Sequence, residues 1–206
     1  MKKLLLAIGL VLLVSGSAQA APVYYAGTGH YYDLIEDPNY DPVQGIGGYT
    51  WEEARVEAEN LSYLGVSGHL ATVTTPEENG FITEVLMLNA SADRYWLGGF
   101  QPDGSGQPGV NWQWVTGETW TYDKWDAGEP NDQDGVENGQ ENALEIFSPL
   151  FPDPDLSSYW NDVSGSNVWP AYVVEYGGPP VPEPATLSLL AAGMLGASYF
   201  LRRRKG

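Results

Sequence analysis

The two ends of the chain are apolar segments flanked by positive charge, and they confine the folded part to the residues between them. Residues 1–20 place Lys2 and Lys3 before an apolar run and end at an Ala-x-Ala site, the pattern of a secretory signal peptide. The apolar run is too short to span a bilayer comfortably, so an N-terminal membrane anchor is the weaker alternative. The folded part is therefore expected to begin near residue 21 and to be exported.

The C-terminal end, residues 179–206, carries a second apolar run over 185–201, and a cluster of basic residues follows it. The run is at the lower end of the roughly 17–25 residues that a transmembrane helix needs, and the basic cluster would keep that end on the cytoplasmic side. VPEP stands directly before it, at 181–184. This arrangement resembles the PEP-CTERM sorting signal of Gram-negative bacteria, which implies a membrane sortase that recognises and removes the tail. An ordinary tail anchor is the alternative. We expect transient inner-membrane anchoring, followed by a cell-surface or extracellular location.

The body between these segments, residues 21–178, has the length of one domain and a strongly acidic composition. The whole chain has a net charge of −18, and of its Lys and Arg residues only Arg55, Arg94 and Lys124 lie in the body. Such a polyanion repels nucleic acid and attracts cations. The chain has no cysteine and only two histidines, which excludes disulfides, thiol catalysis and zinc sites of the Cys or multi-His kind. A metal bound here needs oxygen ligands, which favours calcium before magnesium.

Periodicity and capping residues predict an α+β domain with two early helices and mostly later strands. Residues 50–64 fit an amphipathic helix that begins with a capping box of Thr50 and Glu53. Residues 75–88 fit a second helix, in which Glu78 closes another capping box. Strands are predicted at 29–36, 68–73, 94–100, 111–115, 142–147 and 171–176. Helices that precede most of the strands favour an antiparallel sheet.

The order of the sequence motifs resembles that of a C-type lectin-like domain. The motifs lie between about Val23 and Tyr176, and the two predicted helices flank the first of them. In chain order they are HLATV, YWLGG, WQWVTGE, YDKWDAGEPN, ENALEI, YWND and AYVVEY. The specific part of the resemblance is EPN, preceded by Trp-x-x-Gly and followed by WND before a terminal strand. It implies two helices flanking antiparallel sheets, with a long irregular calcium-binding loop region.

The resemblance also implies a ligand set for Ca²⁺. The positions that bind the ion in calcium-dependent members hold the expected residue types, here Glu129, Asn131, Glu141, Asn161 and Asp162. The same five residues would bind sugar, because open coordination positions on the ion accept two vicinal hydroxyls. Carboxylate and amide oxygens are ligands that calcium prefers, and their mutual repulsion would make the ion order the loop. The EPN order implies mannose-, glucose- or N-acetylglucosamine-type sugars, and the family pattern implies a cis bond before Pro130.

Two features bear on how closely the family pattern is followed. The two usual disulfides are missing, with Ala58 and Val174 at one pair of positions and Ala143 and Gly165 at the other. Asp132 matches a position that binds a second calcium ion in some members. Either calcium supplies the order that a disulfide normally gives to the loops, or the loop is loose and binding is weak.

The sequence therefore predicts an exported, calcium-dependent carbohydrate-binding module, with exopolysaccharide or another glycan as ligand and the sortase as processing partner. One alternative keeps the fold but makes the domain a structural or protein-binding matrix component with purely structural calcium. Another is a glycosidase, since such enzymes pair carboxylates; however, each carboxylate here has a role as a ligand or solvated acid, and no catalytic residue is predicted. Trp120, Trp125 and Trp169 are candidates for stacking on a sugar ring.

Overall fold

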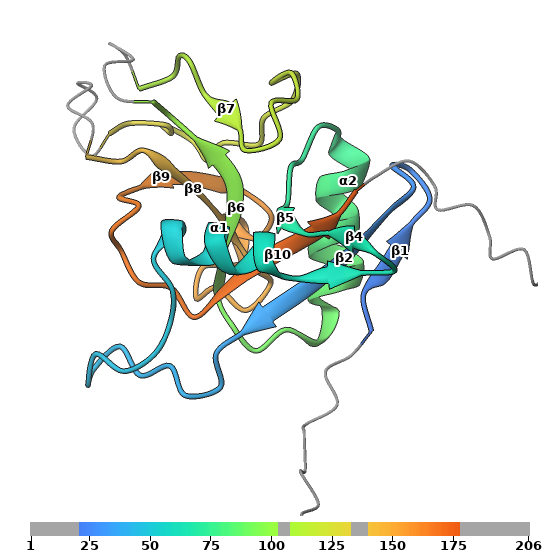
Figure 1. Cartoon of the computed structure of the whole chain (residues 1–206). Helices are drawn as coiled ribbons and strands as arrows, with labels where there is room; N and C mark the ends of the chain where they lie inside the picture. Colours follow the sequence, from blue (N-terminus) through green and yellow to red (C-terminus); the bar gives the residue numbers. More distant parts are fainter. Residues whose placement is uncertain (1–20, 103–107, 133–139, 178–206) are drawn as a thin grey trace, which may run out of the picture.

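A mixed sheet forms the centre of the fold in the computed structural model, which describes residues 21–102, 108–132 and 140–177 (Figure 1). Its strands are β1 (Val23–Tyr25), β2 (His30–Glu36), β5 (His69–Leu70), β6 (Arg94–Phe100), β7 (Gln113–Trp114), β8 (Ala143–Phe147), β9 (Trp160–Val163) and β10 (Ala171–Tyr176). The order is β1-β2-β10-β6-β8-β9, with β5 paired to β10 and β7 to β6. The predicted antiparallel pairing holds except between β10 and β6, which are parallel. A separate hairpin joins β3 (Ser62–Tyr63) and β4 (Val66–Ser67).

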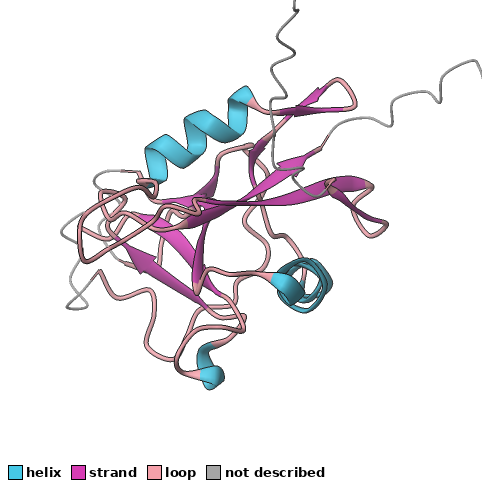
Figure 2. Cartoon of the chain, turned by 90° about the horizontal axis from the view of Figure 1, so that it is seen from below, coloured by secondary structure: helices cyan, strands magenta, loops and turns pink. Residues whose placement is uncertain are grey.

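Helical segments cover both faces of this sheet, as Figure 2 shows. On one face lies α1 (Trp51–Asn60), and on the other lie α2 (Pro76–Gly80), η1 (Phe81–Val85) and η2 (Leu86–Asn89). The core cluster under α1 contains Ala54, Ala58, Leu70, Trp96, Ala143, Val163, Tyr172, Val174 and Tyr176. The opposite cluster includes Phe81, Ile82, Met87, Tyr95, Leu97, Leu144, Ile146, Trp160, Ala171 and Val173. Residues alternate between the two clusters along β8 and β10 because side chains in a strand point to opposite faces with a period of two.

The starts of both helices follow the sequence prediction, with one difference in capping. At α1, Thr50 Oγ1 accepts the N–H of Glu53 (3.3 Å), and the Glu53 carboxylate accepts the N–H of Thr50 (2.8 Å), so the predicted capping box is present. At α2, Thr75 Oγ1 accepts the N–H of Glu78 (3.2 Å). The Glu78 carboxylate, however, accepts the N–H of Thr74 (2.8 Å) instead of Thr75. The second capping box is therefore wrong in detail, although its N-cap residue is correct.

The helix ends differ more from the prediction. The segment predicted as one helix over 75–88 is α-helical only to Gly80, then π-helical and then 3₁₀-helical. Thr83 Oγ1 donates to the carbonyl of Asn79 (2.9 Å), and such a side-chain bond to the i−4 carbonyl competes with regular helix hydrogen bonding. The first helix ends at Asn60 because Leu61 is extended and leads into β3.

Several strands are shorter than predicted, and four were missed: β1, β3, β4 and β9. The predicted strand over 68–73 reduces to β5, and the predicted strand over 111–115 reduces to β7. The WND motif, which the sequence analysis used only as a ligand motif, is itself strand β9. Its tryptophan, Trp160, is fully buried and holds the start of β9 in the core. The polar residues Asn161 and Asp162 follow directly after it.

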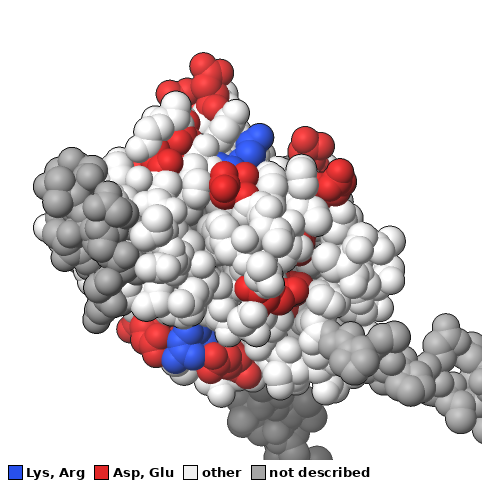
Figure 3. All heavy atoms as spheres, turned by 90° about the horizontal axis from the view of Figure 1, so that it is seen from above, with Lys and Arg blue, Asp and Glu red and all other residues white. Residues whose placement is uncertain are grey.

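The predicted signal peptide (1–20) and sorting segment (179–206, with its helix at 185–201) lie outside the described residues. Within the part of the chain that the structure describes, no helix is long and apolar enough to cross a membrane. On the face drawn in Figure 3, acidic groups are distributed over several places and the few Lys and Arg groups lie beside them.

Candidate functional site

Strand β9 brings the EPN loop and the WND motif together at one edge of the sheet. The N–H of Trp160 donates to the carbonyl of Lys124 (2.9 Å), and the N–H of Asp126 donates to the carbonyl of Trp160 (2.9 Å). The segment that leads into the EPN loop therefore runs along β9. On its other side β9 pairs with β8, where Glu145 lies opposite Asn161. Three separate segments of the chain therefore meet here.

Two buried carboxylates fasten these segments to each other. Asp162 is 1% exposed, and its Oδ1 and Oδ2 accept the N–H groups of Asn131 (3.0 Å) and Asp132 (2.8 Å). Asp132 is fully buried, and its Oδ1 accepts the N–H groups of Gln140 (3.0 Å) and Glu141 (2.8 Å). Asp162 thus holds the EPN loop on β9, and Asp132 holds the start of the segment that carries Glu141. The family pattern marked Asp132 only as a possible ligand of a second calcium ion, and its anchoring role is visible only in the fold.

Glu129 lies in the same group of carboxylates. The Glu129–Pro130 peptide bond is cis, as the resemblance implied. Burial raises the pKa of Glu129 to about 7, and the neighbouring carboxyl groups of Asp162 and Glu141 act in the same direction. Among the described residues, Glu129 Oε2 and Asn131 Oδ1 are buried and have no hydrogen-bond partner. Buried polar atoms are nearly always paired, so two such oxygens beside further carboxylates are an unusual arrangement.

Asn161 is turned toward a residue that the sequence analysis did not select. Its Nδ2 donates to Oε1 of Glu145 (2.9 Å). Glu145 is 1% exposed, and burial raises its pKa to about 7 although Arg94 acts to lower it. The signal that could have marked Glu145 is a lone acidic residue in the otherwise apolar strand ALEIF, because glutamate is almost never fully buried unless it is paired.

The predicted ligand residues thus lie around one edge of the sheet. Glu129, Asn131, Glu141 and Asp162 are linked through the contacts above, and Asn161 precedes Asp162 on β9. Within residues 21–102, 108–132 and 140–177, no group of three or more His, Cys, Asp or Glu is arranged by itself as a metal site. The three carboxylates of the predicted set, Glu129, Glu141 and Asp162, lie in these residues and do not by themselves form such a group. Asp134 and Glu137 of the acidic loop lie outside the described residues.

The tryptophans proposed as sugar platforms pack on the protein instead. Trp120 stacks on Trp114, with 4.3 Å between ring centroids, and Trp125 packs against the same core cluster. Trp169 packs on the cluster under α1, with the guanidinium of Arg94 4.4 Å from its ring centroid. These contacts give the three rings structural roles.

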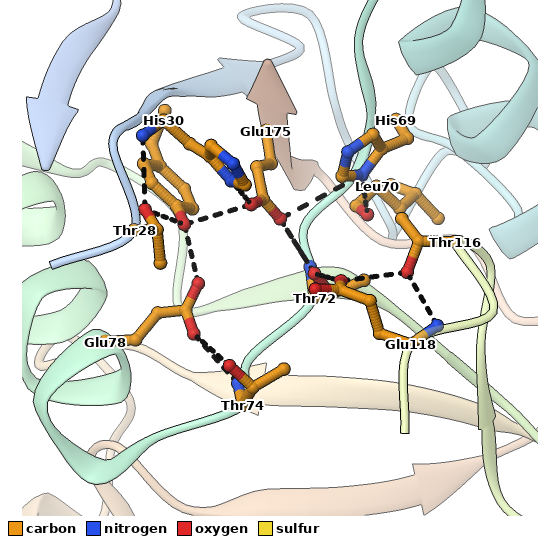
Figure 4. Close-up of polar contacts among 11 residues, drawn as sticks. Thr28, His30, His69, Leu70, Thr72, Thr74, Glu78, Thr116, Glu118 and Glu175 are labelled. Carbon is orange, nitrogen blue, oxygen red and sulfur yellow. Dashed lines mark hydrogen bonds and ion pairs between the residues drawn. The ribbon is translucent and has the colours of Figure 1, made fainter. Parts of the chain in front are cut away.

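A second group of buried acidic side chains surrounds Glu175 on β10 (Figure 4). Glu175 is 2% exposed; its Oε1 lies 2.5 Å from Nδ1 of His30, and its Oε2 accepts the N–H of Thr72 (2.9 Å). The hydroxyl of Tyr32 donates to Glu78 (2.6 Å). The His30 hydrogen bond helps to hold the pKa of Glu175 below its ordinary value against the opposing effect of burial. Both oxygens of Glu175 have partners, so this group ties strands together and differs from the EPN site.

Comparisons with known proteins agree with the motif order. Residues 48–170 match the C-type lectin domain, and residues 180–205 match the PEP-CTERM protein-sorting motif. The chain belongs to the C-type lectin domain family and carries a PEP-CTERM sorting signal. It therefore contains a lectin-type domain and a signal for export and surface sorting, and its family consists of binding proteins rather than enzymes.

Individual relatives support the same assignment. The chain is similar to halomucin of Haloquadratum walsbyi (31% identity over 163 residues, 73% of this chain and 1% of halomucin). It is also similar to a lectin of Pleurodeles waltl (30% over 114 residues, 55% of this chain and 56% of that lectin). It thus spans a very small part of the first and about half of the second. The structure of the cow C-type carbohydrate-recognition domain of CD23 shares the fold, with a TM-score of 0.55, 23% identity and coverage of 79% of this chain and 98% of that one. The predicted fold class is confirmed.

Proposed function

We propose that residues 21–178 form a carbohydrate-binding domain that depends on calcium, held by Glu129, Asn131, Glu141, Asn161 and Asp162. When bound, calcium would supply coordination positions for two vicinal hydroxyls of a sugar. The protein's own groups would complete the contact, because each hydroxyl donates to a carboxylate and accepts from an amide N–H. Glu129 with Asn131, and Glu141 with Asn161, supply such pairs.

The observation that carries this proposal is the pair of buried, unpaired oxygens, Glu129 Oε2 and Asn131 Oδ1. They lie in a group of acids in which like charges and burial raise the pKa of Glu129. A divalent cation is the partner that fits, because it is bound by oxygen atoms and offsets the repulsion among carboxylates.

The basic side chains of the described body are engaged elsewhere. Arg55 pairs with Glu52 and Glu59 (2.6 and 2.5 Å). Arg94 lies 3.7 Å from Glu145, and Lys124 lies over the ring of Tyr159. No basic side chain in the described body is therefore paired with Glu129, which supports a metal ion in that role.

The ligand we propose is a mannose- or glucose-like sugar of a surface or matrix polysaccharide. EPN is the motif that goes with such sugars in the family, and the related CD23 domain was studied in the presence of a GlcNAc2Man3 oligosaccharide. The sorting signal supports a surface location. We further propose that helix 185–201 anchors the protein in the inner membrane until the sortase removes residues 179–206.

Calorimetry and a glycan array, each with calcium and with chelator, test this function. We expect calcium to bind with a Kd of about 10⁻⁴–10⁻³ M, the range of calcium sites in extracellular modules, and we expect glycan binding to require calcium. Glu129→Gln should abolish both, since it removes a charged ligand. Stability that depends on calcium without glycan binding would favour the structural matrix component. Absence of any calcium heat from the folded wild type would reject the metal site.

The stability of the calcium-free protein is expected to fall as pH rises from about 5 to 8. Glu129 has a pKa of about 7 in the folded state, whereas an unfolded glutamate loses its proton near its ordinary value of about 4.3. Between these values the folded state binds more protons, so stability decreases with pH. The raised pKa values of Glu145 and His30 act in the same direction.

Thermal unfolding midpoints measured from pH 5 to pH 8 with chelator, and again with calcium, check this prediction; the range follows from the folded and unfolded pKa values. Calcium should flatten the dependence because it binds the ionised carboxylates. Glu129→Gln should reduce the slope without calcium. A midpoint that rises with pH over this range would contradict the prediction.

A further inference from the structure

Glu145 touches the proposed calcium site, yet it is not a member of the ligand set. We propose that Glu145 is a positioning residue, which fixes the side-chain amide of Asn161 so that its oxygen faces the cation. This inference rests on the proposed function. It concerns Asn161, a proposed ligand whose side-chain amide donates to a residue outside the set.

The hydrogen bond between the two residues sets the direction of the amide. Asn161 Nδ2 donates to Glu145 Oε1 (2.9 Å). An asparagine amide carries its acceptor oxygen on one arm and an NH₂ group with two N–H donors on the other arm. When Glu145 accepts from the nitrogen, the oxygen is on the other arm and the second N–H stays available. That orientation matches what a calcium ligand that also contacts a sugar hydroxyl requires. Partners of this kind orient metal ligands in many proteins.

Packing does not explain a glutamate at this position. Leu144, Ile146 and Phe147 of the same strand are all buried, and Glu145 itself is 1% exposed. Its Oε2 is buried without a hydrogen-bond partner among the described residues. A buried carboxylate that is incompletely paired destabilises a fold, and well-packed apolar residues often replace such groups without loss. Glu175, at 2% exposed, shows the contrasting case, because both of its oxygens accept hydrogen bonds.

Arg94 holds the other end of the Glu145 carboxylate. Its Nη1 lies 3.7 Å from Glu145 Oε2, beyond hydrogen-bond distance but close enough for an ion pair. The guanidinium is itself enclosed by aromatic rings, with its central carbon 4.4 Å from the ring centroid of Trp169 and 5.1 Å from that of Phe151. The fixed positive group attracts Oε2, which leaves Oε1 directed at Asn161.

Calcium titration of the exported protein carrying Glu145→Leu, Glu145→Gln or Glu175→Gln tests the inference. Glu145→Leu should weaken calcium binding about 10–100-fold, the usual effect of losing a partner of a metal ligand. Its thermal midpoint without calcium should stay the same or rise, because a poorly paired buried carboxylate is gone. Glu145→Gln keeps an acceptor oxygen and should recover most of the affinity. Glu175→Gln, the matched buried control, should lower the midpoint and leave calcium affinity unchanged.

The outcomes separate this inference from the proposed function. Weaker calcium binding by Glu145→Leu without any loss of calcium-free stability, together with recovery of affinity in Glu145→Gln, supports the positioning role. Wild-type affinity in Glu145→Leu overturns it while the calcium site stands. Glu145 has only a structural role if Glu145→Leu is less stable without calcium and Glu145→Gln loses as much calcium affinity as Glu145→Leu. That result also overturns the positioning role. A wild type that binds no calcium overturns both proposals.

Discussion

Asp162→Ala is expected to abolish calcium binding and, unlike Glu129→Gln, to destabilise the calcium-free protein. Asp162 is both a proposed ligand and the acceptor for the N–H groups of Asn131 and Asp132. Hydrogen bonds to charged groups contribute about 1.5–3 kcal/mol each, and a buried donor left unpaired adds a penalty. We therefore expect a loss of roughly 2–5 kcal/mol in the free energy of unfolding with chelator present. Chemical denaturation and calorimetry of the same variant measure the two effects.

Matched variants separate the two roles of this carboxylate. Asp162→Asn keeps one acceptor oxygen, so it should fold better than the alanine variant and still bind calcium weakly or not at all. Glu129→Gln should lose calcium binding with little loss of calcium-free stability, because its Oε2 makes no hydrogen bond among the described residues. Asp155→Ala, at an exposed aspartate, should change neither property. Full calcium affinity in Asp162→Ala would remove Asp162 from the ligand set.

The large elements of this fold could be predicted from sequence because their signals are local. The nearly continuous run of apolar and β-branched residues in AYVVEY predicts β10, and its two faces do enter the two core clusters. Thr50 and Glu53 predict the start of α1 because a capping box needs only those two residues at the right spacing. Motif order supplied the family, from which the meeting of EPN and WND followed.

The parts that could not be predicted depend on distant partners or on competing local bonds. The bond from Thr83 to the carbonyl of Asn79 accompanies a change of helix type that the apolar pattern does not show. The anchoring role of Asp132 depends on Gln140 and Glu141, whose backbone positions are set by the fold. Glu145 had a readable signal, but its partner Asn161 is identified only by strand pairing. Site chemistry was therefore predicted as a ligand list, and its supporting contacts came from the structure.

The double substitution Ala143→Cys and Gly165→Cys is expected to restore a disulfide that the family has and this chain lacks. A Cβ built on Gly165 lies 3.5 Å from Cβ of Ala143, within the roughly 3.5–4.5 Å that disulfides require. Closing this segment should raise the free energy of unfolding by about 2–4 kcal/mol. For a domain of this size, that corresponds to a rise of roughly 5–10 °C in the unfolding midpoint.

The bridge should also tighten calcium binding, which links the missing disulfide to the function of the site. Ala143 follows Glu141 closely, and Gly165 follows Asp162 closely, so the bridge would hold two ligand segments together before the ion arrives. Holding a binding site in its bound arrangement improves affinity by reducing the ordering that binding requires. Thermal unfolding, thiol titration and calcium calorimetry should compare three kinds of sample. These are the oxidised double variant, the same variant after reduction, and each single cysteine variant. Equal unfolding midpoints for the oxidised and reduced forms, or two titratable thiols after oxidation, would show that the two positions do not meet. A higher midpoint with unchanged calcium affinity would show that the bridge stabilises the fold without ordering the ligand segments.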